Sequence, residues 1–532
     1  MNPSTELARA VVTALCGAGV REVVLAPGSR NAPVSFALYD AAQAGGVRLH
    51  TRIDERSGAF LALGLAKVSG RATAVVCTSG TAVANLLPAV AEAAHAGVPV
   101  VVVTADRPAR LRGTGANQTT DQDGIFGSFA PTLDIAVADL DALLAFVRTH
   151  EFRRPVHLNV QLDDPLLPDD AWDGGEVPTW AVPAVGRARD IPVLDLGPRT
   201  VVVAGDDAGP PARQLAESAG WPLFAEPSSG CRTGDAVVRT YRLLLGGDLG
   251  DRIERVVVFG HPTLSRPVSR LLAREDVEVV SVRARGVWPA RPFAVSAEHD
   301  GVSVTAADDP AWGEEWHLAD LSVGRQLDRL LLAEPDLTPY EVAGAVSRAL
   351  PRGGLMFVGA SNPIRDLDLM VAPYEVGGRR KVIANRGLAG IDGTVSSAIG
   401  AALGRPQSSR AVALMGDVTF LHDVTGLILS PREARPDLTI VVVNDDGGSI
   451  FATLEQGAPA YADRFDALFG TPHGVEIASL CGAMRVPHLA VTSLPELEHA
   501  LASPNGGIEV VEARVRRDNR ADLERRIRAL TP

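Results

Sequence analysis

Residues 411–454 read AVALMGDVTFLHDVTGLILSPREARPDLTIVVVNDDGGSIFATL. The pattern predicts an apolar strand, a glycine turn, a helix, a second apolar strand and a second glycine turn. Asp417 follows Gly416 at the end of the first strand, and Asp445 ends the second, ahead of Gly447 and Gly448. Because parallel strands bring their carboxyl ends to one edge of a sheet, we expect both carboxylates there, where they suit a divalent cation and a phosphate. Two ordinary polar turns would show the same spacing, and the spacing alone leaves both interpretations open.

Two other segments repeat parts of this plan. Residues 75–108, VVCTSGTAVANLLPAVAEAAHAGVPVVVVTADRP, also join a strand, a small polar turn, a helix and a valine-rich strand ending in an aspartate. VLAPGSRN at 24–31 similarly resembles FVGASNPIRD at 357–366. These repeats predict two related sheets on either side of a third, less similar unit. Similarity that is general among α/β proteins is the open alternative.

The chain as a whole alternates short apolar strands with helices, which predicts an α/β protein with three parallel-sheet domains. We expect domains at 1–182, 183–333 and 334–532, with a proline-rich linker at 165–192. The first domain should have helices at 32–44, 57–68 and 81–96, after an N-terminal helix capped by Ser4 or Thr5. The expected strands, taken from the N-terminus, are 23–26, 47–53, 74–78, 98–104, 156–160, 200–204, 255–260, 277–282, 355–359, 382–384, 411–415, 438–444 and 508–513.

Composition excludes several classes of function. At 532 residues, the chain exceeds the roughly 250–300 residues at which a single core stops growing. The net charge is −13, and Lys67 and Lys381 are the only lysines, so no basic stripe for nucleic acid is present. The four cysteines are far apart and suggest neither zinc nor a disulfide framework. The N-terminus does not resemble a signal peptide and no apolar run reaches the ~20 residues of a membrane span, so we expect a cytoplasmic protein.

Two further stretches are candidates for chemistry. Glu55 stands where a strand leads into an apolar helix, a position that favourable electrostatics at a helix N-terminus would also explain, with Asp54 or Ser57 as the cap. TSGTAVAN at 78–85 is a turn of small residues that opens a helix. Its backbone N–H groups can bind an anion or allow a ligand to approach closely.

These residues together resemble the thiamine diphosphate-dependent enzymes. Those enzymes have three α/β domains, which are in order a pyrimidine-binding domain, a central domain and a diphosphate-binding domain. The family's GDG…NN metal motif stands here as GDV at 416–418 and NDD at 444–446. Val418 replaces a glycine and Asp445 an asparagine, and an oxygen ligand is kept. Glu55 occupies the position of the glutamate that activates the cofactor.

The resemblance implies a set of ligands for the cofactor and for its divalent cation, Mg²⁺ or Mn²⁺. The cation would be held by Asp417, Asp445 and the Gly447 carbonyl. The implied cofactor-binding residues are Glu55, Thr78, Ser79, Gly80, Ile391, Gly416, Asp417, Val418, Asp445, Gly447 and Ile450. In this family the site lies between two subunits, which implies a homodimer or homotetramer.

Within that family the chain is most similar to the 2-succinyl-5-enolpyruvyl-6-hydroxy-3-cyclohexene-1-carboxylate synthases, the MenD family. The blocks that carry this similarity are APGSRNAP (26–33), RIDERSGAFLALGLA (52–66), TSGTAVANLLPAV (78–90), ADRPARLRGTGANQT (105–119), GASNPIRD (359–366), NRGLAGIDGTVSSAIGAALG (385–404) and NDDGGSIF (444–451). The implied activity is that of a transferase in menaquinone biosynthesis. It decarboxylates 2-oxoglutarate and adds the resulting succinyl-semialdehyde carbanion to isochorismate.

Both implied substrates are dicarboxylates, and guanidinium groups bind carboxylates through bidentate hydrogen bonds. The blocks supply four arginines in loops at expected strand ends, although a single arginine is more often a solvated surface charge. The expected substrate-binding residues are Ser29, Arg30, Arg107, Asn117, Gln118, Ser361, Arg365, Arg386, Ile450 and Phe451. The polar members of this set are also common loop-stabilising residues, and the apolar ones can equally belong to the core.

The sequence bears on three alternatives. Another thiamine diphosphate enzyme, such as a 2-oxoacid decarboxylase or an acetolactate synthase, would share Glu55 and the metal motif without needing the arginines. A non-catalytic member of the family would be expected to lack Glu55 or the metal carboxylates. An NAD-dependent dehydrogenase would need a glycine fingerprint after the first strand, and none is present.

Overall fold

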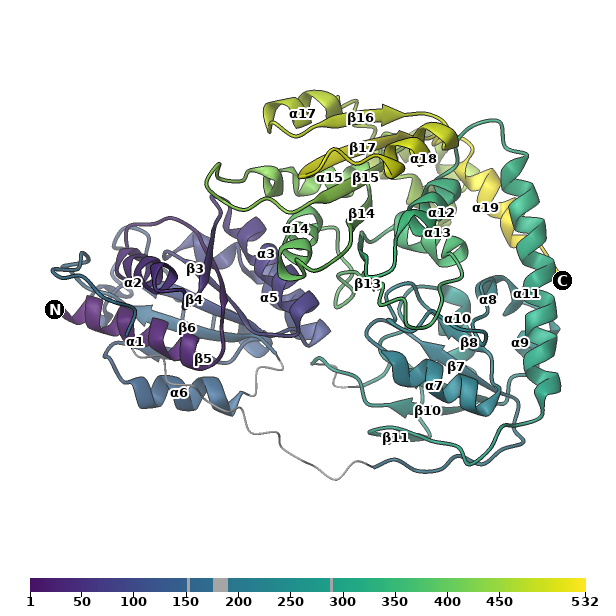
Figure 1. The fold of residues 1–532 in the computed structure, drawn as a ribbon, viewed down its shortest axis with the longest axis horizontal. Coiled ribbons are helices and arrows are strands. Elements are labelled where there is room, and N and C mark those ends of the chain that lie inside the picture. Colours follow the sequence, from purple (N-terminus) through teal and green to yellow (C-terminus); the bar gives the residue numbers. More distant parts are fainter. Residues whose placement is uncertain (151–153, 176–189, 288–289) are drawn as a thin grey trace.

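The computed structural model describes residues 1–150, 154–175, 190–287 and 290–532. Its strands form three parallel sheets covered by helices, one in each third of the chain (Figure 1). The predicted fold class is therefore confirmed. Within the described residues, no helix combines the length and the apolarity that crossing a bilayer requires.

The N-terminal domain follows the predicted alternation and adds two elements to it. Its strands are β1 (Glu22–Leu25), β2 (Arg48–Thr51), β3 (Thr73–Cys77), β4 (Val100–Asp106), β5 (Thr132–Ile135) and β6 (Val156–Gln161). Its helices are α1 (Pro3–Gly17), α2 (Ala32–Gln43), α3 (Glu55–Ser69), α4 (Thr81–Ala84), α5 (Leu87–Ala96) and α6 (Leu140–Thr149). Sequence reasoning missed β5 and α6, and it joined α4 and α5 into one helix. The predicted cap of α1 was wrong, because Asn2 accepts the hydrogen bond from Thr5 N at 2.8 Å.

The central domain has the strands β7 (Thr200–Ala204), β8 (Leu223–Ala225), β9 (Arg255–Phe259), β10 (Glu278–Val282) and β11 (Ala297–His299). Its helices are α7 (Pro210–Ala219), α8 (Tyr241–Leu244), α9 (Asp248–Asp251), α10 (Arg266–Leu272) and the long α11 (Pro310–Leu332). Figure 1 shows α11 running along the outside of this domain toward the C-terminal domain. The short edge strands β8 and β11 were not predicted.

The C-terminal domain contains the stretch 411–454. Its strands are β12 (Leu355–Val358), β13 (Lys381–Ile383), β14 (Ala411–Gly416), β15 (Leu438–Asn444), β16 (His488–Val491) and β17 (Ile508–Arg514). Its helices are α12 (Pro339–Ala349), α13 (Asn362–Met370), α14 (Thr394–Gly404), α15 (Asp417–His422), α16 (Ala462–Phe465), α17 (Ile477–Ala483), α18 (Leu494–Ala502) and α19 (Arg520–Arg528). The helix expected between β14 and β15 is short, because α15 gives way to the 3₁₀ turn η3 (Val424–Leu427) and a segment containing Pro431 and Pro436.

The first and third sheets have the same topology. Their strand orders are β2-β1-β3-β4-β6-β5 and β13-β12-β14-β15-β17-β16, which become identical when each sheet is numbered from its own first strand. The central sheet, ordered β11-β10-β9-β7-β8, differs. The predicted pair of related sheets is thus confirmed. The domain boundaries stay predictions, and the first of them, at 182/183, lies outside the described residues.

The two related domains meet where α3 crosses α14 (Figure 1). Small residues let the helix backbones touch. A Cβ atom added to Gly64 would lie 2.1 Å from Ser397 O, and one added to Gly400 would lie 2.2 Å from Leu61 O. Both helices are buried on most of their surface, as expected for helices inside a core. This crossing fixes the position of Glu55 at the start of α3 relative to the C-terminal domain of the same chain.

We therefore expect Gly64→Ala to destabilise the protein by about 1–3 kcal/mol, the usual cost of overpacking a close-packed site. Chemical denaturation followed by circular dichroism measures the change. Gly482→Ala in α17 is the matched control, because a Cβ atom there meets nothing within 4 Å and alanine favours a helix by up to about 1 kcal/mol. Equal stabilities for Gly64→Ala and the unmodified chain would contradict the close crossing.

Candidate active site

Neighbouring strands bring the two predicted metal ligands together. Strands β14 and β15 pair in parallel with Gly416 opposite Val443, so Asp417 and Asp445 follow at the same edge of the sheet. They line a cavity of about 170 Å³. Nine of the predicted site residues line this cavity: Ser361, Ile391, Gly416, Asp417, Val418, Asp445, Gly447, Ile450 and Phe451.

The two carboxylates are crowded and poorly solvated. Asp417 is 2% exposed and accepts hydrogen bonds from Val418 N at 2.7 Å and Gly447 N at 2.9 Å. Burial raises the pKa of Asp417. Burial together with the charge of Asp417 raises the pKa of Asp445 to about 7. A bound cation would relieve this repulsion, since it favours the charged form of both groups.

The two carboxylates fit a hard divalent cation whose remaining oxygen ligands come from the backbone. Among the described residues, no group of three or more His, Cys, Asp or Glu side chains is arranged to hold a metal. Two carboxylates therefore require a backbone carbonyl as well, and Gly447 is the predicted source. A Cβ atom on Gly447 would lie 2.1 Å from Gly470 O, so the turn accepts only glycine. His473, which sequence reasoning missed, faces Asp417 with Nε2 and Oδ2 3.1 Å apart.

Ser361 lies on the same cavity in an unusual conformation. Its φ of +70° falls in the left-handed region that a non-glycine residue adopts rarely. The Ser361 carbonyl accepts a hydrogen bond of 2.7 Å from Arg365 Nη1. Such strain of about 1–3 kcal/mol is found preferentially at functional sites, and here it places the serine and the arginine together.

Arg365 and Arg386 form a pair of like charges near this cavity. Burial, together with the positive charges of Arg386 and Arg242, lowers the pKa of the Arg365 guanidinium. Arg386 is 3% exposed, donates to Thr263 Oγ1 at 2.8 Å, and has no hydrogen-bond partner at Nε among the described residues. Two adjacent guanidiniums with an unsatisfied donor are suited to an anionic ligand.

Glu226, which directly follows β8, is a buried acid that interacts electrostatically with both arginines of this pair. It is 3% exposed and accepts a hydrogen bond of 2.9 Å from Leu264 N. Burial raises its pKa to about 8, even though Arg386 and the Leu264 amide favour the charged form. Sequence reasoning missed Glu226, because an acidic residue after an apolar strand is common.

The raised pKa of Glu226 predicts a pH-dependent stability. Because the folded protein binds this proton more tightly than the unfolded chain, the contribution is fully present below the ordinary pKa of 4.5 and is lost as the pH rises through about 8. Glu226→Gln keeps an acceptor for Leu264 N and cannot ionise. We expect its free energy of unfolding to fall less than that of the unmodified chain between pH 5 and pH 8, measured by urea titration. Parallel pH profiles would contradict this assignment.

The N-terminal domain holds the other predicted residues, beginning with Glu55. Asp54 caps α3 through Oδ1, which accepts from Arg56 N at 3.0 Å and from Ser57 N at 3.3 Å. Glu55 is therefore not needed as the cap. Among the described residues its carboxylate has one hydrogen bond, a long one of 3.5 Å from Asn85 Nδ2. A carboxylate so little engaged is available to a ligand.

The turn at Thr78, Ser79 and Gly80 packs against Gln118. Ser79 Oγ donates to Gln118 O at 2.9 Å, and Gln118 Nε2 donates to Ser79 O at 3.3 Å. The turn is also held by Gln122, whose Oε1 accepts from Gly80 N at 3.0 Å. Sequence reasoning missed Gln122, which lies just outside the 105–119 block. Two of the predicted cofactor residues, Ser79 and Gly80, are thus next to the predicted substrate residue Gln118.

Arg30 and Arg107 form a second pair of like charges. Burial and the charge of Arg107 lower the pKa of the Arg30 guanidinium, whose Nε has no hydrogen-bond partner in the described part of the chain. Arg107 is 9% exposed and donates to Asn117 O through Nη2 at 2.8 Å. Ser29 lies in the adjoining turn, where its carbonyl accepts from Ala32 N. The four predicted arginines therefore fall into two pairs, one in each related domain.

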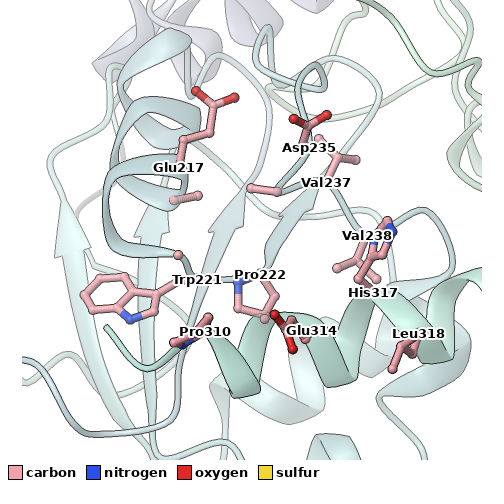
Figure 2. Close-up of a pocket in the computed structure, with 14 residues that line it drawn as sticks. Glu217, Trp221, Pro222, Asp235, Val237, Val238, Pro310, Glu314, His317 and Leu318 are labelled. Carbon is pink, nitrogen blue, oxygen red and sulfur yellow. The ribbon is translucent and has the colours of Figure 1, made fainter. Parts of the chain in front are cut away.

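Within a single chain, the cavity at Asp417 does not bring the two groups of residues together. The described residues that line the cavity at Asp417 all come from the C-terminal domain, and Glu55 is not among them. A larger pocket, of about 760 Å³, lies elsewhere, in the central domain. Figure 2 shows Trp221, Pro222 and Pro310 in it, with the carboxylates of Glu217 and Asp235 toward the top of the view. None of the predicted site residues is among those that line it.

Two family models match the N-terminal and the C-terminal parts of the chain separately. Residues 5–125 match the model of the thiamine pyrophosphate enzyme N-terminal TPP binding domain, and residues 367–512 match that of the C-terminal TPP binding domain. Thiamine pyrophosphate is another name for thiamine diphosphate.

Three curated relatives carry the name 2-succinyl-5-enolpyruvyl-6-hydroxy-3-cyclohexene-1-carboxylate synthase. The protein from a Nocardioides species is 68% identical over 99% of this chain and 98% of its own length. Those from Kineococcus radiotolerans and Rhodococcus erythropolis are 45% and 44% identical, each over 99% of this chain and over 98% and 100% of their own lengths. The chain belongs to the thiamine pyrophosphate enzymes and, within them, to the 2-succinyl-5-enolpyruvyl-6-hydroxy-3-cyclohexene-1-carboxylate synthase family.

Proposed function

We propose that this chain is the thiamine diphosphate-dependent transferase that makes 2-succinyl-5-enolpyruvyl-6-hydroxy-3-cyclohexene-1-carboxylate for menaquinone biosynthesis. It joins the four-carbon fragment left by decarboxylation of 2-oxoglutarate to isochorismate and releases CO₂. The observation that carries this proposal is that four arginines form two pairs, Arg30 with Arg107 and Arg365 with Arg386, beside the proposed cofactor site. Two pairs of guanidiniums, each with one buried and one half-buried member, match two dicarboxylate substrates.

The C-terminal residues are proposed to hold the diphosphate end of the cofactor. Asp417, Asp445 and the Gly447 carbonyl would ligate Mg²⁺ or Mn²⁺, and the Gly416 turn with Val418 would lie against the phosphates. Ile391 and Ile450, which line the same cavity, would contact the cofactor rings. When bound, thiamine diphosphate supplies the carbon nucleophile and accepts the electron pair left by the departing CO₂.

The N-terminal residues are proposed to serve the pyrimidine end. Glu55 would hold a proton at a pyrimidine ring nitrogen, and Thr78, Ser79 and Gly80 would lie along that ring. Since Glu55 does not line the cavity at Asp417 in its own chain, we propose that one complete site uses Glu55 from one subunit and Asp417 from another. The protein would then be a homodimer or a homotetramer.

The remaining residues are proposed to bind and separate the substrates. Gln118 and Asn117 accompany the first arginine pair and Ser29, whereas Ser361 accompanies the second. Phe451 would form an apolar wall that keeps water from the reacting carbon, so that the fragment is joined to isochorismate and not protonated. We also propose a cytoplasmic location, which suits the four buried free cysteines of the chain.

A product assay tests the function. The purified protein, thiamine diphosphate and Mg²⁺ would be incubated with 2-oxoglutarate and isochorismate, and the product mass recorded. We expect the mass of the succinyl adduct, formed only with both substrates and lost when the cation is chelated. Equal or faster CO₂ release from pyruvate would support a different 2-oxoacid decarboxylase or an acetolactate synthase-like enzyme. An inert, fully loaded protein would support a non-catalytic role.

Replacement of Arg386 tests the substrate site. Arg386→Ala should raise KM for one of the two dicarboxylates by about 10–100-fold, because charge-assisted hydrogen bonds contribute about 1.5–3 kcal/mol. Steady-state kinetics with each substrate varied in turn measures the effect. Arg435→Ala, which removes an exposed arginine, is the control and should leave both KM values unchanged. Unchanged kinetics in Arg386→Ala would remove this residue from the site.

A further inference from the structure

A buried carboxylate of the N-terminal domain holds a loop of the C-terminal domain. Glu92, in α5, is 4% exposed. Its Oε1 accepts a hydrogen bond of 2.7 Å from Gly387 N, and its Oε2 accepts one of 2.6 Å from Leu388 N. The two residues are consecutive, so the carboxylate binds the loop backbone at two adjacent points.

The loop so held carries two of the proposed site residues. It joins β13 to α14, and it contains Arg386 directly before the clamped amides and Ile391 shortly after them. Arg386 is held on its other side by Thr263 of the central domain, at 2.8 Å from Nη2. The guanidinium is therefore positioned between an anchored backbone and an anchored side chain.

The contact is specific and not a consequence of general packing. A Cβ atom on Gly387 would lie 2.4 Å from the Glu92 carbonyl oxygen and 2.9 Å from Ala96 N, so the loop touches α5 only because residue 387 is glycine. In the described part of the chain, Glu92 has no ion-pair partner, although burying a carboxylate costs several kcal/mol unless it is well hydrogen-bonded. The two amides provide that compensation. An apolar residue would fill the same space without this cost and without fixing the loop.

We propose that Glu92 is a positioning residue for substrate binding, which fixes the Arg386 guanidinium by holding the Gly387 and Leu388 amides. The inference rests on the proposed function, because the role of Arg386 is part of that proposal. Glu92 itself would not contact substrate. It makes the geometry of the second arginine pair depend on the N-terminal domain of the same chain, through α5, which Figure 1 shows beside α3 near the junction with the C-terminal domain.

Glu92→Gln tests the clamp directly. The amide side chain keeps one acceptor and turns an N–H₂ group toward the second backbone N–H, so one hydrogen bond is lost and two donors face each other. Hydrogen–deuterium exchange followed by mass spectrometry should show exchange about tenfold faster in a peptide spanning 385–392, as expected for the loss of about one hydrogen bond. Glu509→Gln is the matched control. Glu509 is a buried glutamate of β17 that accepts hydrogen bonds from Thr439 and Asn505, which are not part of the 385–392 loop. This control should leave exchange at 385–392 unchanged.

A double-mutant cycle with Arg386→Ala tests the positioning role. Glu92→Gln alone should raise the same KM that Arg386→Ala raises, by about tenfold, and change kcat by less than about threefold. In the Arg386→Ala background, Glu92→Gln should change that KM by less than about twofold, because its effect passes through the missing guanidinium. Glu92→Asp, which keeps both acceptor oxygens, should be closer to the unmodified chain than Glu92→Gln.

The outcomes separate this inference from the function on which it rests. Faster exchange with unchanged KM, or effects of the two substitutions that multiply independently, would overturn the positioning role while the product assay stands. Unchanged exchange in Glu92→Gln would overturn the clamp itself. Arg386→Ala with the kinetics of the unmodified chain would instead contradict the proposed substrate site, and an unmodified protein that makes no adduct would contradict the proposed function.

Discussion

Glu55→Gln should abolish most turnover while the protein still binds its cofactor. Glutamine has nearly the same shape and can still form a hydrogen bond, but it cannot hold a proton as a carboxyl group does. Proton transfer by a positioned side chain contributes about 100–10,000-fold, so we expect kcat to fall by that range. The structure favours this assignment because Asp54 already caps α3 and leaves the Glu55 carboxylate with one long contact. Single-turnover kinetics and calorimetric titration with thiamine diphosphate and Mg²⁺ measure the two quantities.

The comparison of binding with turnover makes this test decisive. Cofactor affinity within about threefold of the unmodified chain would show that the substitution has not disturbed the fold of the site. Near-normal turnover at that affinity would contradict a catalytic role for Glu55. Loss of turnover and of cofactor binding together would point to a structural role at the start of α3.

Asp417→Asn should have the opposite signature: cofactor binding is lost, and the stability of the free protein becomes less dependent on pH. Removing one of two carboxylate ligands should weaken Mg²⁺-dependent binding of thiamine diphosphate by at least about 100-fold. Burial and the negative charge of Asp417 together raise the pKa of Asp445 to about 7, and without cofactor the substitution removes that charge. Because that repulsion destabilises the folded chain as the pH rises through 7, the unfolding temperature of the free variant should fall less than that of the unmodified chain between pH 5 and pH 8. Calorimetric titration and thermal unfolding measure the two effects.

Asp446→Asn is the matched control for this substitution. Asp446 is adjacent to Asp445, but its carboxylate accepts hydrogen bonds from His473 N and Gly474 N, which the asparagine carbonyl can also accept. We expect it to retain metal-dependent cofactor binding. Equal binding by Asp417→Asn and Asp446→Asn would contradict the proposed metal site.

Much of the fold was predictable because it depends on local patterns. Unbroken valine-rich strands such as β4 and β15 specify a buried parallel sheet, and their repetition with similar turns indicated two related domains. The same regularity placed Asp417 and Asp445 at one sheet edge, because consecutive strands joined by a helix pair in parallel. The choice among α/β enzymes came from a resemblance to a family, since fold alone does not determine function.

The remaining features depend on contacts that are distant in the sequence. The clamp from Glu92 to Gly387 joins residues in different domains, and the pKa of Glu226 depends on its burial and on the charge of Arg386 in another domain. Neither has a local sequence signal. The edge strands β8 and β16 were missed because they are short and carry little periodicity. Likewise, the sequence placed all the site residues in one list, whereas in one chain the described residues that line the cavity at Asp417 come from the C-terminal domain alone.

The most direct test of a site shared between subunits is complementation between two inactive variants. Glu55→Gln and Asp417→Asn chains would be co-expressed with different affinity tags, and the mixed dimer isolated on both. If each site uses Glu55 from one chain and Asp417 from the other, one of the two sites in the mixed dimer is intact. Its activity should then be about half that of the unmodified protein under the symmetry of a dimer. Activity no higher than that of either variant alone would show that each chain builds its own site and would contradict the account.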